Sequence, residues 1–414
     1  MNRIRNALVL SLAAAGVGTG LLATAAPAAA DGTITWAPAN SVATGDQDNA
    51  AVAAVRTGYT AVVWEDDRDT TAPADNVHSD VFLRLYRNGT SLYETKLTTG
   101  GTGNWRHVQP DVALRENGTA IVVFATDGDG NGYYQIAVRQ VSTSGTVTGS
   151  ATANASATGQ QIRPAVAVDP LGSRFAVAFE DDQDTTAPTV RMSGFASITA
   201  KSYEVQVHPT GGTHRRPDVA MGLAGNAIVA WDEDGDANAT FNVARKVLTP
   251  TGGTAVAQAV ANVNTGGQQR HPSVAANANG DFAVAWETDH TGTAQVAVRS
   301  FGATGVARSA VDTVLPGTDP QVGIDDQLSV AVAWTQTVTA TDGVDVMVQG
   351  LNPDGSASGR QPRLRANTTV AGRQDEPALA VDPWGLITLA HTDDSDGNLF
   401  DQVYLGTGLT NSTW

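Results

Sequence analysis

One segment of this sequence recurs seven times, and residues 270–286 are its clearest copy. A short apolar run over residues 273–276 leads to Asn279-Gly280, and a second apolar run follows over residues 282–286. An Asn-Gly pair between two such runs is typical of a β-hairpin. The sequence therefore predicts seven hairpins, joined by loops that differ from copy to copy.

The copies are spaced like the blades of a β-propeller. The central apolar residue of each first strand recurs at intervals of 48 to 60 residues: Val52, Val112, Val166, Val219, Val274, Val322 and Leu379. A buried-type aromatic residue follows this marker after twelve or thirteen positions in six copies: Trp64, Phe124, Phe179, Trp231, Trp286 and Trp334. His391 takes its place in the last copy. Such regular spacing indicates one repeated structural unit.

The second predicted strand has apolar residues on both faces, with Phe282, Val284 and Trp286 on one side and Ala283 and Ala285 on the other. Blades that stack face to face need this pattern, whereas a two-sheet sandwich would alternate apolar and polar residues. A third strand and a weaker fourth strand follow each hairpin. We expect an all-β fold, a seven-bladed β-propeller of four-stranded antiparallel blades, over residues 31–414.

The last blade lacks a complete fourth strand, because only residues 406–414 follow its third strand. At the other end of the chain, residues 33–37 and 41–45 precede the first copy, much as residues 262–266 precede the fifth. We therefore expect the N-terminal strand to complete the seventh blade and to close the ring.

The first 30 residues are typical of a secretory signal peptide. Arg3 and Arg5 precede an apolar run, and Ala28-Ala29-Ala30 offers a cleavage site. The chain has no cysteine and a net charge of −17, which excludes disulfides and argues against nucleic acid and anionic membranes as partners. We expect a secreted, extracellular and monomeric protein.

Propeller topology places two sets of loops on one face of the ring. One set precedes the first strands and is rich in Arg, His and Gln, and the other follows the second strands and is acidic. The candidate binding residues belong to the first set: Arg106, His107, Arg163, His214, Arg216, Arg270, His271 and Arg373. Two functions are open for them, bridging carboxylates of adjacent blades or capturing an anionic group at the channel mouth.

Metal binding has two candidate sites. Asp127, Asp129 and Asn131 supply oxygen atoms at alternate positions, which suits calcium, although no Glu follows at the twelfth loop position of an EF-hand. His107, His214 and His271 would form a second site if they converged from separate blades. The alternatives are a solvated acidic turn and histidines that serve as loop hydrogen-bond donors.

Common catalytic motifs are missing from the sequence. It contains no cysteine, no Gly-x-Ser-x-Gly, no His-Glu-x-x-His, and none of the Ser-x-Asp-x-Gly-x-x-Trp boxes of sialidases. We therefore expect a protein that is not an enzyme. Two alternatives stay open, a lectin with Trp105 as its aromatic platform and a hydrolase with Asp319 and Glu376 as a carboxylate pair.

Several features together resemble a family of secreted actinomycete propellers, the dispase autolysis-inducing proteins. They are the signal ending in Ala30, the mature start at residues 31–36, the absence of cysteine and the repeated Pro-x-Val-Ala pattern. The resemblance implies a non-enzymatic protein that promotes the autolysis of thermolysin-like extracellular metalloproteases. It also implies a glutamine donor for a secreted transglutaminase, but it transfers no contact residues.

Four glutamines are candidates for transglutaminase modification: Gln160, Gln161, Gln268 and Gln269. They lie in predicted loops beside Gly, Thr and Ser, and transglutaminase needs glutamines on exposed backbone. The alternative is that they are ordinary polar loop residues.

Overall fold

The structure is a computed structural model that describes residues 34–68, 78–99, 105–169, 171–182, 187–338, 343–359, 361–369, 371–395 and 400–410. The predicted signal peptide, residues 1–30, lies outside the described residues. Within the described part of the chain no helix is long and apolar enough to cross a membrane.

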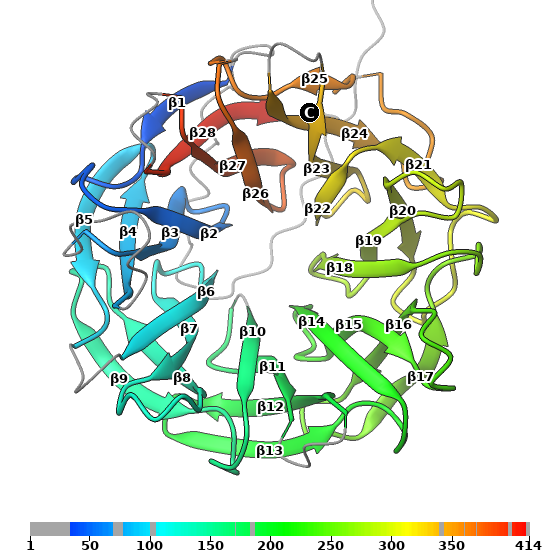
Figure 1. The fold of residues 1–414 in the computed structure, drawn as a ribbon, viewed down its shortest axis with the longest axis horizontal. Helices are drawn as coiled ribbons and strands as arrows, with labels where there is room; N and C mark the ends of the chain where they lie inside the picture. The colour runs from blue at the N-terminus through cyan, green and yellow to red at the C-terminus, as the bar shows by residue number, and fades with distance from the viewer. Residues whose placement is uncertain are drawn as a thin grey trace, which may run out of the picture.

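Seven four-stranded antiparallel sheets are arranged in a ring around a central channel (Figure 1). The innermost strands are β2 (Gln47–Ala54), β6 (Arg106–Leu114), β10 (Gln161–Val168), β14 (Thr213–Met221), β18 (Gln269–Ala276), β22 (Thr318–Ile324) and β26 (Gln374–Val381). The second strands are β3 (Tyr59–Asp66), β7 (Ala120–Asp127), β11 (Phe175–Asp181), β15 (Ala227–Asp234), β19 (Phe282–Thr288), β23 (Val330–Thr337) and β27 (Leu386–Asp393). This arrangement confirms the predicted seven-bladed propeller.

The outer half of each blade faces the rim. The third strands are β4 (Asp80–Arg87), β8 (Gln135–Val141), β12 (Thr189–Ser197), β16 (Asn242–Leu248), β20 (Gln295–Phe301), β24 (Val344–Leu351) and β28 (Gln402–Thr410). The fourth strands are β5 (Thr90–Lys96), β9 (Val147–Thr152), β13 (Ala200–Gln206), β17 (Thr254–Val260), β21 (Thr313–Pro316), β25 (Leu364–Arg365) and, from the other end of the chain, β1 (Thr35–Pro38). Blades are numbered below by the order of their first strands.

The N-terminal strand closes the ring, as the sequence predicts. The last sheet has the order β1-β28-β27-β26, and Trp36 of β1 pairs with Gly406 of β28 (Figure 1). The Trp36 indole N–H donates to the carbonyl oxygen of Ala366 at 2.9 Å, and its ring lies edge-on to His391. Closure thus joins the two ends of the chain in one blade.

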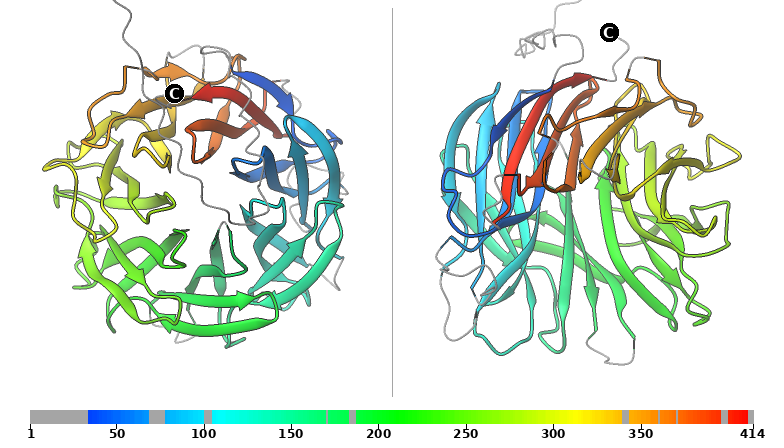
Figure 2. Two further views of the ribbon diagram at one scale, coloured as in Figure 1. Left: turned by 180° about the vertical axis from the view of Figure 1, so that it is seen from behind. Right: turned by 45° about the horizontal axis from the view of Figure 1, so that its top comes forward.

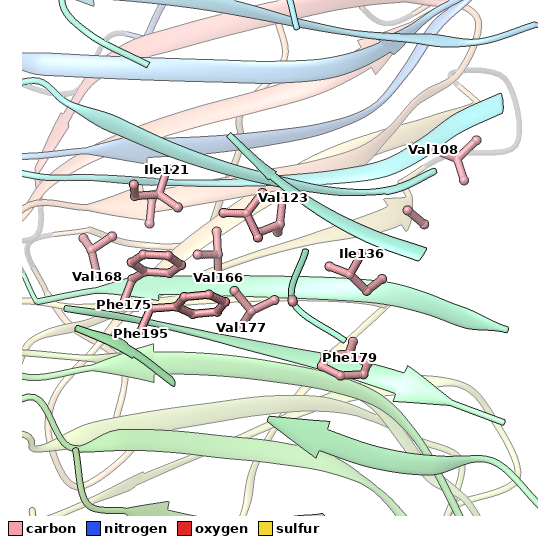
Figure 3. Close-up of a cluster of buried hydrophobic side chains, with 14 residues drawn as sticks. Val108, Ile121, Val123, Ile136, Val166, Val168, Phe175, Val177, Phe179 and Phe195 are labelled. Atoms are coloured by element: carbon pink, nitrogen blue, oxygen red, sulfur yellow. The ribbon is translucent and has the colours of Figure 1, made fainter. Parts of the chain in front are cut away.

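The core lies between neighbouring blades, because both faces of each sheet are apolar. Figure 3 shows Ile121 and Val123 of β7 facing Phe175 and Val177 of β11 across the boundary between blades 2 and 3. Phe175 also stacks on Phe195 with the ring centroids 4.4 Å apart. Replacing a fully buried aromatic side chain of this kind by alanine typically costs about 3 to 5 kcal/mol.

A tight turn joins the first two strands of each blade. These turns lie on the lower face of the ring, which is the face opposite the loops that precede the first strands. In blade 5 the N–H of Gly280 donates to the carbonyl oxygen of Asn277, and Gly280 has a φ of +82°. A residue without a side chain adopts this left-handed conformation at no steric cost. In blade 6, Leu328 occupies the same place with a φ of 70°, as a strained exception.

Candidate functional site

Each first strand carries a bulge close to its start. In β18 the pairing with β19 shifts between Arg270 and Ser273, and His271 within the shift has a φ of 53°. The equivalent residue in every blade has a φ between 48° and 55°: Asn49, Gln109, Arg163, Arg216, His271, Asp319 and Glu376. We call these seven residues the mouth ring. A left-handed conformation of a residue other than glycine costs on the order of 1 to 3 kcal/mol, so seven of them in register need a compensating interaction.

Hydrogen bonds between blades supply that compensation. The backbone N–H of Arg216 donates to Glu180 at 3.2 Å, that of His271 to Asp232 at 2.8 Å, and that of Asp319 to Glu287 at 2.9 Å. Each acceptor is the carboxylate that directly follows the buried aromatic residue of the preceding blade. The bulge therefore turns the N–H of a ring residue toward its neighbouring blade.

The side chains of the mouth ring surround the upper opening of the channel. They line a cavity of about 570 Å³ together with the prolines that follow most of them. Figure 2 shows the channel from the opposite side, with the inner strands converging on it. The opening lies on the face that carries the loops before the first strands and after the second strands, as predicted.

The ring is electrically polarised. Arg163, Arg216 and His271 come from three consecutive blades and form a basic arc, while Asp319 and Glu376 follow on the next two. Arg163 pairs with Glu180, and Arg216 pairs with Asp232, each at 3.0 Å. The two arginine side chains keep 37 % and 32 % of their surface exposed, so part of each guanidinium faces the cavity.

These contacts correct one predicted role. Arg163 and Arg216 do not bridge adjacent blades, because Arg163 and Glu180 both belong to blade 3 and Arg216 and Asp232 both belong to blade 4. The carboxylates make the bridge instead, through the backbone N–H of the next ring residue. The arginines thus neutralise these carboxylates and present their remaining donors at the mouth.

The acidic side of the mouth holds carboxyl groups with raised pKa values. The walls of the mouth desolvate Glu376, and Asp375 and Asp319 lie nearby, so the pKa of Glu376 is raised. Burial raises the pKa of Glu65 to about 7. Burial and then Glu65 raise the pKa of Asp48 to about 9. Several carboxyl groups in this arc therefore keep their protons at a higher pH than isolated ones.

A second cavity, of about 300 Å³, continues the channel below the mouth. Asp111 and Asp218 line it, and burial raises their pKa values to about 7 and about 6. Each carboxylate accepts a backbone N–H from the next first strand, Asp111 from Val166 at 2.7 Å and Asp218 from Val274 at 2.6 Å. These two carboxylates therefore connect neighbouring first strands through hydrogen bonds.

Two predicted histidines point away from the mouth. His107 is buried beside the Thr126 hydroxyl at 2.8 Å, and His214 is buried between Glu233 at 2.8 Å and the carbonyl oxygen of Gly211 at 2.7 Å. They stand two positions before the ring residues and hold loops in place. His107, His214 and His271 therefore do not converge on one metal, and His107 and His214 fit the alternative of histidines that hydrogen-bond loops, while His271 alone of the three lines the cavity.

Three predicted arginines also lie outside the residues that line the mouth. Arg373 forms ion pairs with Asp401 and Asp375, and the Arg270 guanidinium lies 5.0 Å from the centre of the Phe241 ring. Arg106 acts electrostatically on Glu65 and lowers its pKa against the larger effect of burial. Of the eight candidate binding residues, the structure brings together Arg163, Arg216 and His271.

The four candidate glutamines divide into two pairs. Gln161 and Gln269 are 0 % and 1 % exposed and begin β10 and β18, which contradicts their predicted place on exposed loops. Gln269 accepts the indole N–H of Trp286 at 2.9 Å. Gln160 and Gln268 are half-buried, and their side-chain amides donate to the carbonyl oxygens of Gly132 and Ala239.

The predicted calcium loop is held by its own backbone. The two carboxylate oxygens of Asp127 accept the N–H groups of Asn131 and Gly132, at 3.0 and 2.9 Å. Asp129 accepts the side-chain amide of Asn131. These bonds account for the acidic turn without an ion, and calcium at this loop stays a prediction.

Trp105, the candidate lectin platform, is half-buried among His78, His107 and Lys96. It is not one of the residues that line the mouth cavity. By contrast, Asp319 and Glu376, the pair considered for a hydrolase, both line that cavity.

Sequence reasoning placed Glu287 and Asp232 in the acidic loops that follow the second strands, but it missed their contacts with the mouth ring and the conformation of that ring. A signal was present, because each ring residue stands three positions before the first-strand marker, and a proline follows it in six copies. The carboxylates directly after Phe179, Trp231 and Trp286 recur at a constant position as well.

Comparison with known proteins gave structural neighbours only, since no family model and no curated protein matches the sequence. A protein of unknown function from Dyadobacter fermentans has a TM-score of 0.53 at 10 % identity, with 90 % of this chain and 98 % of that one covered. The polysaccharide lyase Uly1 has a TM-score of 0.54 at 12 % identity, covering 88 % and 89 %. A Trypanosoma rangeli sialidase mutant with trans-sialidase activity has a TM-score of 0.50 at 9 % identity, covering 93 % and 60 %.

Likeness at this identity establishes the shared propeller fold alone. It still corrects one prediction, that the protein is not an enzyme, because a sialidase and a polysaccharide lyase carry catalysis on this fold. The missing motifs on which that prediction rested therefore do not exclude catalysis.

Proposed function

We propose that this protein is a carbohydrate-active enzyme that binds an anionic saccharide at the mouth ring. The observation that carries the proposal is the polarised ring, in which a basic arc faces carboxyl groups with raised pKa across a cavity of about 570 Å³. Two of the structural neighbours, Uly1 and the Trypanosoma rangeli sialidase mutant, are enzymes of this kind, which supports the class of substrate.

Arg163 and Arg216 are suited to hold an acidic group of the saccharide. A guanidinium has five N–H donors, and the 3.0 Å contact to Glu180 or Asp232 engages one terminal nitrogen of each arginine. The exposed remainder binds a carboxylate or sulfate through paired hydrogen bonds. Because each of these arginines is already paired with one carboxylate, it can bind an anion without a buried, unpaired charge in the empty site.

Glu376 is the candidate proton donor. Its pKa is raised, its side chain is exposed in the mouth, and one carboxylate oxygen is fixed by the backbone N–H of Asn49 at 2.8 Å. A carboxyl group with a raised pKa is the type of group that can protonate the departing glycosidic oxygen as the bond between that oxygen and the sugar breaks. Asp319 is less suited to this role, because it belongs with His271 and Glu287.

A panel of polysaccharides tests the proposal, with uronate, sulfated, sialylated and neutral members. New reducing ends and the absorbance of unsaturated uronates would report hydrolysis and elimination separately. We expect turnover of an anionic member and a loss of about 100-fold or more in kcat for Glu376→Gln. Glu204→Gln is the matched control, because Glu204 lies on the outer strand β13, where it pairs with Lys201 of the same strand and with Arg191 of β12.

No turnover by the wild-type protein, or unchanged turnover by Glu376→Gln, would reject the enzymatic role. Saturable binding to a glycan without turnover would identify the mouth as a lectin site instead.

We also propose, on the resemblance to the dispase autolysis-inducing proteins, that the secreted chain meets an extracellular metalloprotease and a transglutaminase. Gln160 and Gln268 are the candidate glutamine donors, because both keep part of their surface exposed and lie directly before first strands. Amine-dye incorporation and peptide mapping should find label at one of them, and Gln160→Asn with Gln268→Asn should abolish it. Labelling only at other glutamines would reject these two, and an unchanged autolysis rate of a thermolysin-like protease would reject that partner.

A further inference from the structure

Three side chains with metal-binding atoms meet on one side of the mouth. His271, Glu287 and Asp319 each offer a ligand atom, and these atoms all lie within 4.8 Å of one another. His271 and Glu287 belong to blade 5 and Asp319 begins blade 6, so the group spans a blade boundary. In the part of the chain that the structure describes, no other group of His, Cys, Asp and Glu residues is so close.

Both carboxylate oxygens of Glu287 have partners within the group. His271 Nδ1 lies 3.0 Å from one carboxylate oxygen of Glu287, and the other oxygen accepts the backbone N–H of Asp319 at 2.9 Å. Two atoms bound to one zinc ion at 2.0 to 2.1 Å lie roughly 3.3 Å apart in tetrahedral geometry. The separation of 3.0 Å is thus compatible either with a shared proton or with a shared metal ion.

The carboxylate of Asp319 is less committed than that of Glu287. Its side chain is exposed to the mouth and accepts the Thr318 hydroxyl at 3.2 Å. Two carboxylates, those of Glu287 and Asp319, face one imidazole here. A cation between the three side chains would relieve this excess of negative charge.

An independent observation lies in the next blade. Thr335 directly follows Trp334, as Glu287 follows Trp286 and as Asp232 follows Trp231. Side chains at this position reach the ring residue of their own blade and that of the next one, as Asp232 does with Arg216 and His271. Thr335 is 5 % exposed, yet its hydroxyl has no hydrogen-bond partner among the described residues. Thr335 pairs with Thr318, the residue before Asp319, so this buried hydroxyl lies on the strand next to that of Asp319 and has bonding capacity for a ligand.

We propose that His271, Glu287 and Asp319 bind one divalent transition-metal ion, with Zn²⁺ as the best match. Imidazole favours zinc and its neighbours over calcium and magnesium, which prefer oxygen ligands alone. Three protein ligands leave a coordination position open toward the channel, where a water molecule or an anionic ligand can bind. Metal binding does not depend on the proposed saccharide turnover.

Direct binding tests the site on untagged, chelator-treated protein. Titration calorimetry with Zn²⁺ should give one site per chain, and Co²⁺ should give visible absorption bands of a bound ion. Asp319→Asn keeps the shape of the side chain and should weaken Zn²⁺ binding by at least about 100-fold, beyond the 10- to 100-fold cost of losing an outer-shell partner. Asp281→Asn is the matched control, since Asp281 pairs with Arg308, lies in the turn before β19 and is not among the residues that line the mouth.

The proposal predicts that Asp281→Asn binds Zn²⁺ like the wild type, and that thermal unfolding without metal is similar for all three proteins. No saturable binding by the wild type would overturn it. Equal binding by Asp319→Asn would overturn it as well, and so would an equal loss in Asp281→Asn.

Discussion

The closure of the ring can be tested by comparing the same substitution, asparagine to alanine, at equivalent positions in two blades. Asn40 follows β1 and is 6 % exposed. Its side-chain amide donates to Gln47 at 3.0 Å and to Gln402 at 2.7 Å, and its carbonyl oxygen accepts the N–H of Val403 at 3.2 Å. Asn40→Ala would leave these three buried groups without that partner. At about 1 kcal/mol for each lost bond, the free energy of unfolding should fall by about 3 kcal/mol.

Asn262 is the matched residue at the end of blade 4. It donates to Asn242 at 2.9 Å and to the carbonyl oxygen of Asn264 at 2.8 Å, and it accepts the N–H of Val243 at 3.0 Å. Asn262→Ala should therefore cost about 3 kcal/mol too. Urea unfolding followed by tryptophan fluorescence measures both. If Asn40→Ala costs less than about 1 kcal/mol while Asn262→Ala is strongly destabilising, the N-terminal segment does not close the ring.

Two further predictions concern pH. The pKa of the buried His208 is lowered to about 4, first by burial and then by His214, so the unfolded chain binds its proton near pH 6.5 and the folded chain only near pH 4. The free energy of unfolding should therefore fall as the pH drops through this range, by about 1 to 2 kcal/mol between pH 7 and 5. Urea midpoints measured at both pH values should fall less for His208→Gln than for the wild type. An equal fall in both proteins would contradict the lowered pKa of His208. Asp48 has the opposite sign, since its pKa of about 9 keeps a proton on the folded chain that the unfolded chain releases near pH 4. Asp48→Asn should raise the thermal midpoint, and more at pH 8 than at pH 5; an equal effect at both would contradict the raised pKa.

The fold was predictable because its signals are periodic. Val274 and Trp286 have counterparts in every blade or nearly so, and both lie in the interface between blades. The closing N-terminal strand was predictable as well, because residues 41–45 before the first copy resemble residues 262–266 before the fifth. Both results follow from packing, since a blade with two apolar faces must bury both against its neighbours, and a closed ring requires a last blade that is complete.

The site was less predictable because it depends on a backbone irregularity. Proline usually marks the start of a strand, so Ser273 was expected to begin the first strand of blade 5. The bulge at His271 lets pairing continue back to Gln269, which buries Gln269 and turns His271 into the mouth. Gln269 is therefore buried while His271, two positions later, faces the mouth, and the residue types alone do not reveal this difference. The pairing of Arg216 with Asp232 likewise depends on which blade supplies each partner.

The central claim is that the mouth ring binds the acidic group of a saccharide. The most direct test measures kcat/KM and its salt dependence on the saccharide that the wild-type protein turns over, for the double variant Arg163→Met, Arg216→Met. Arg56→Met is the control, because Arg56 forms an ion pair with Glu116 and lines a cavity other than the mouth. We predict a loss of about 100-fold or more for the double variant, mainly through KM, with a weaker salt dependence and with Arg56→Met near wild type. Equal kcat/KM for the double variant and the wild type would contradict the account.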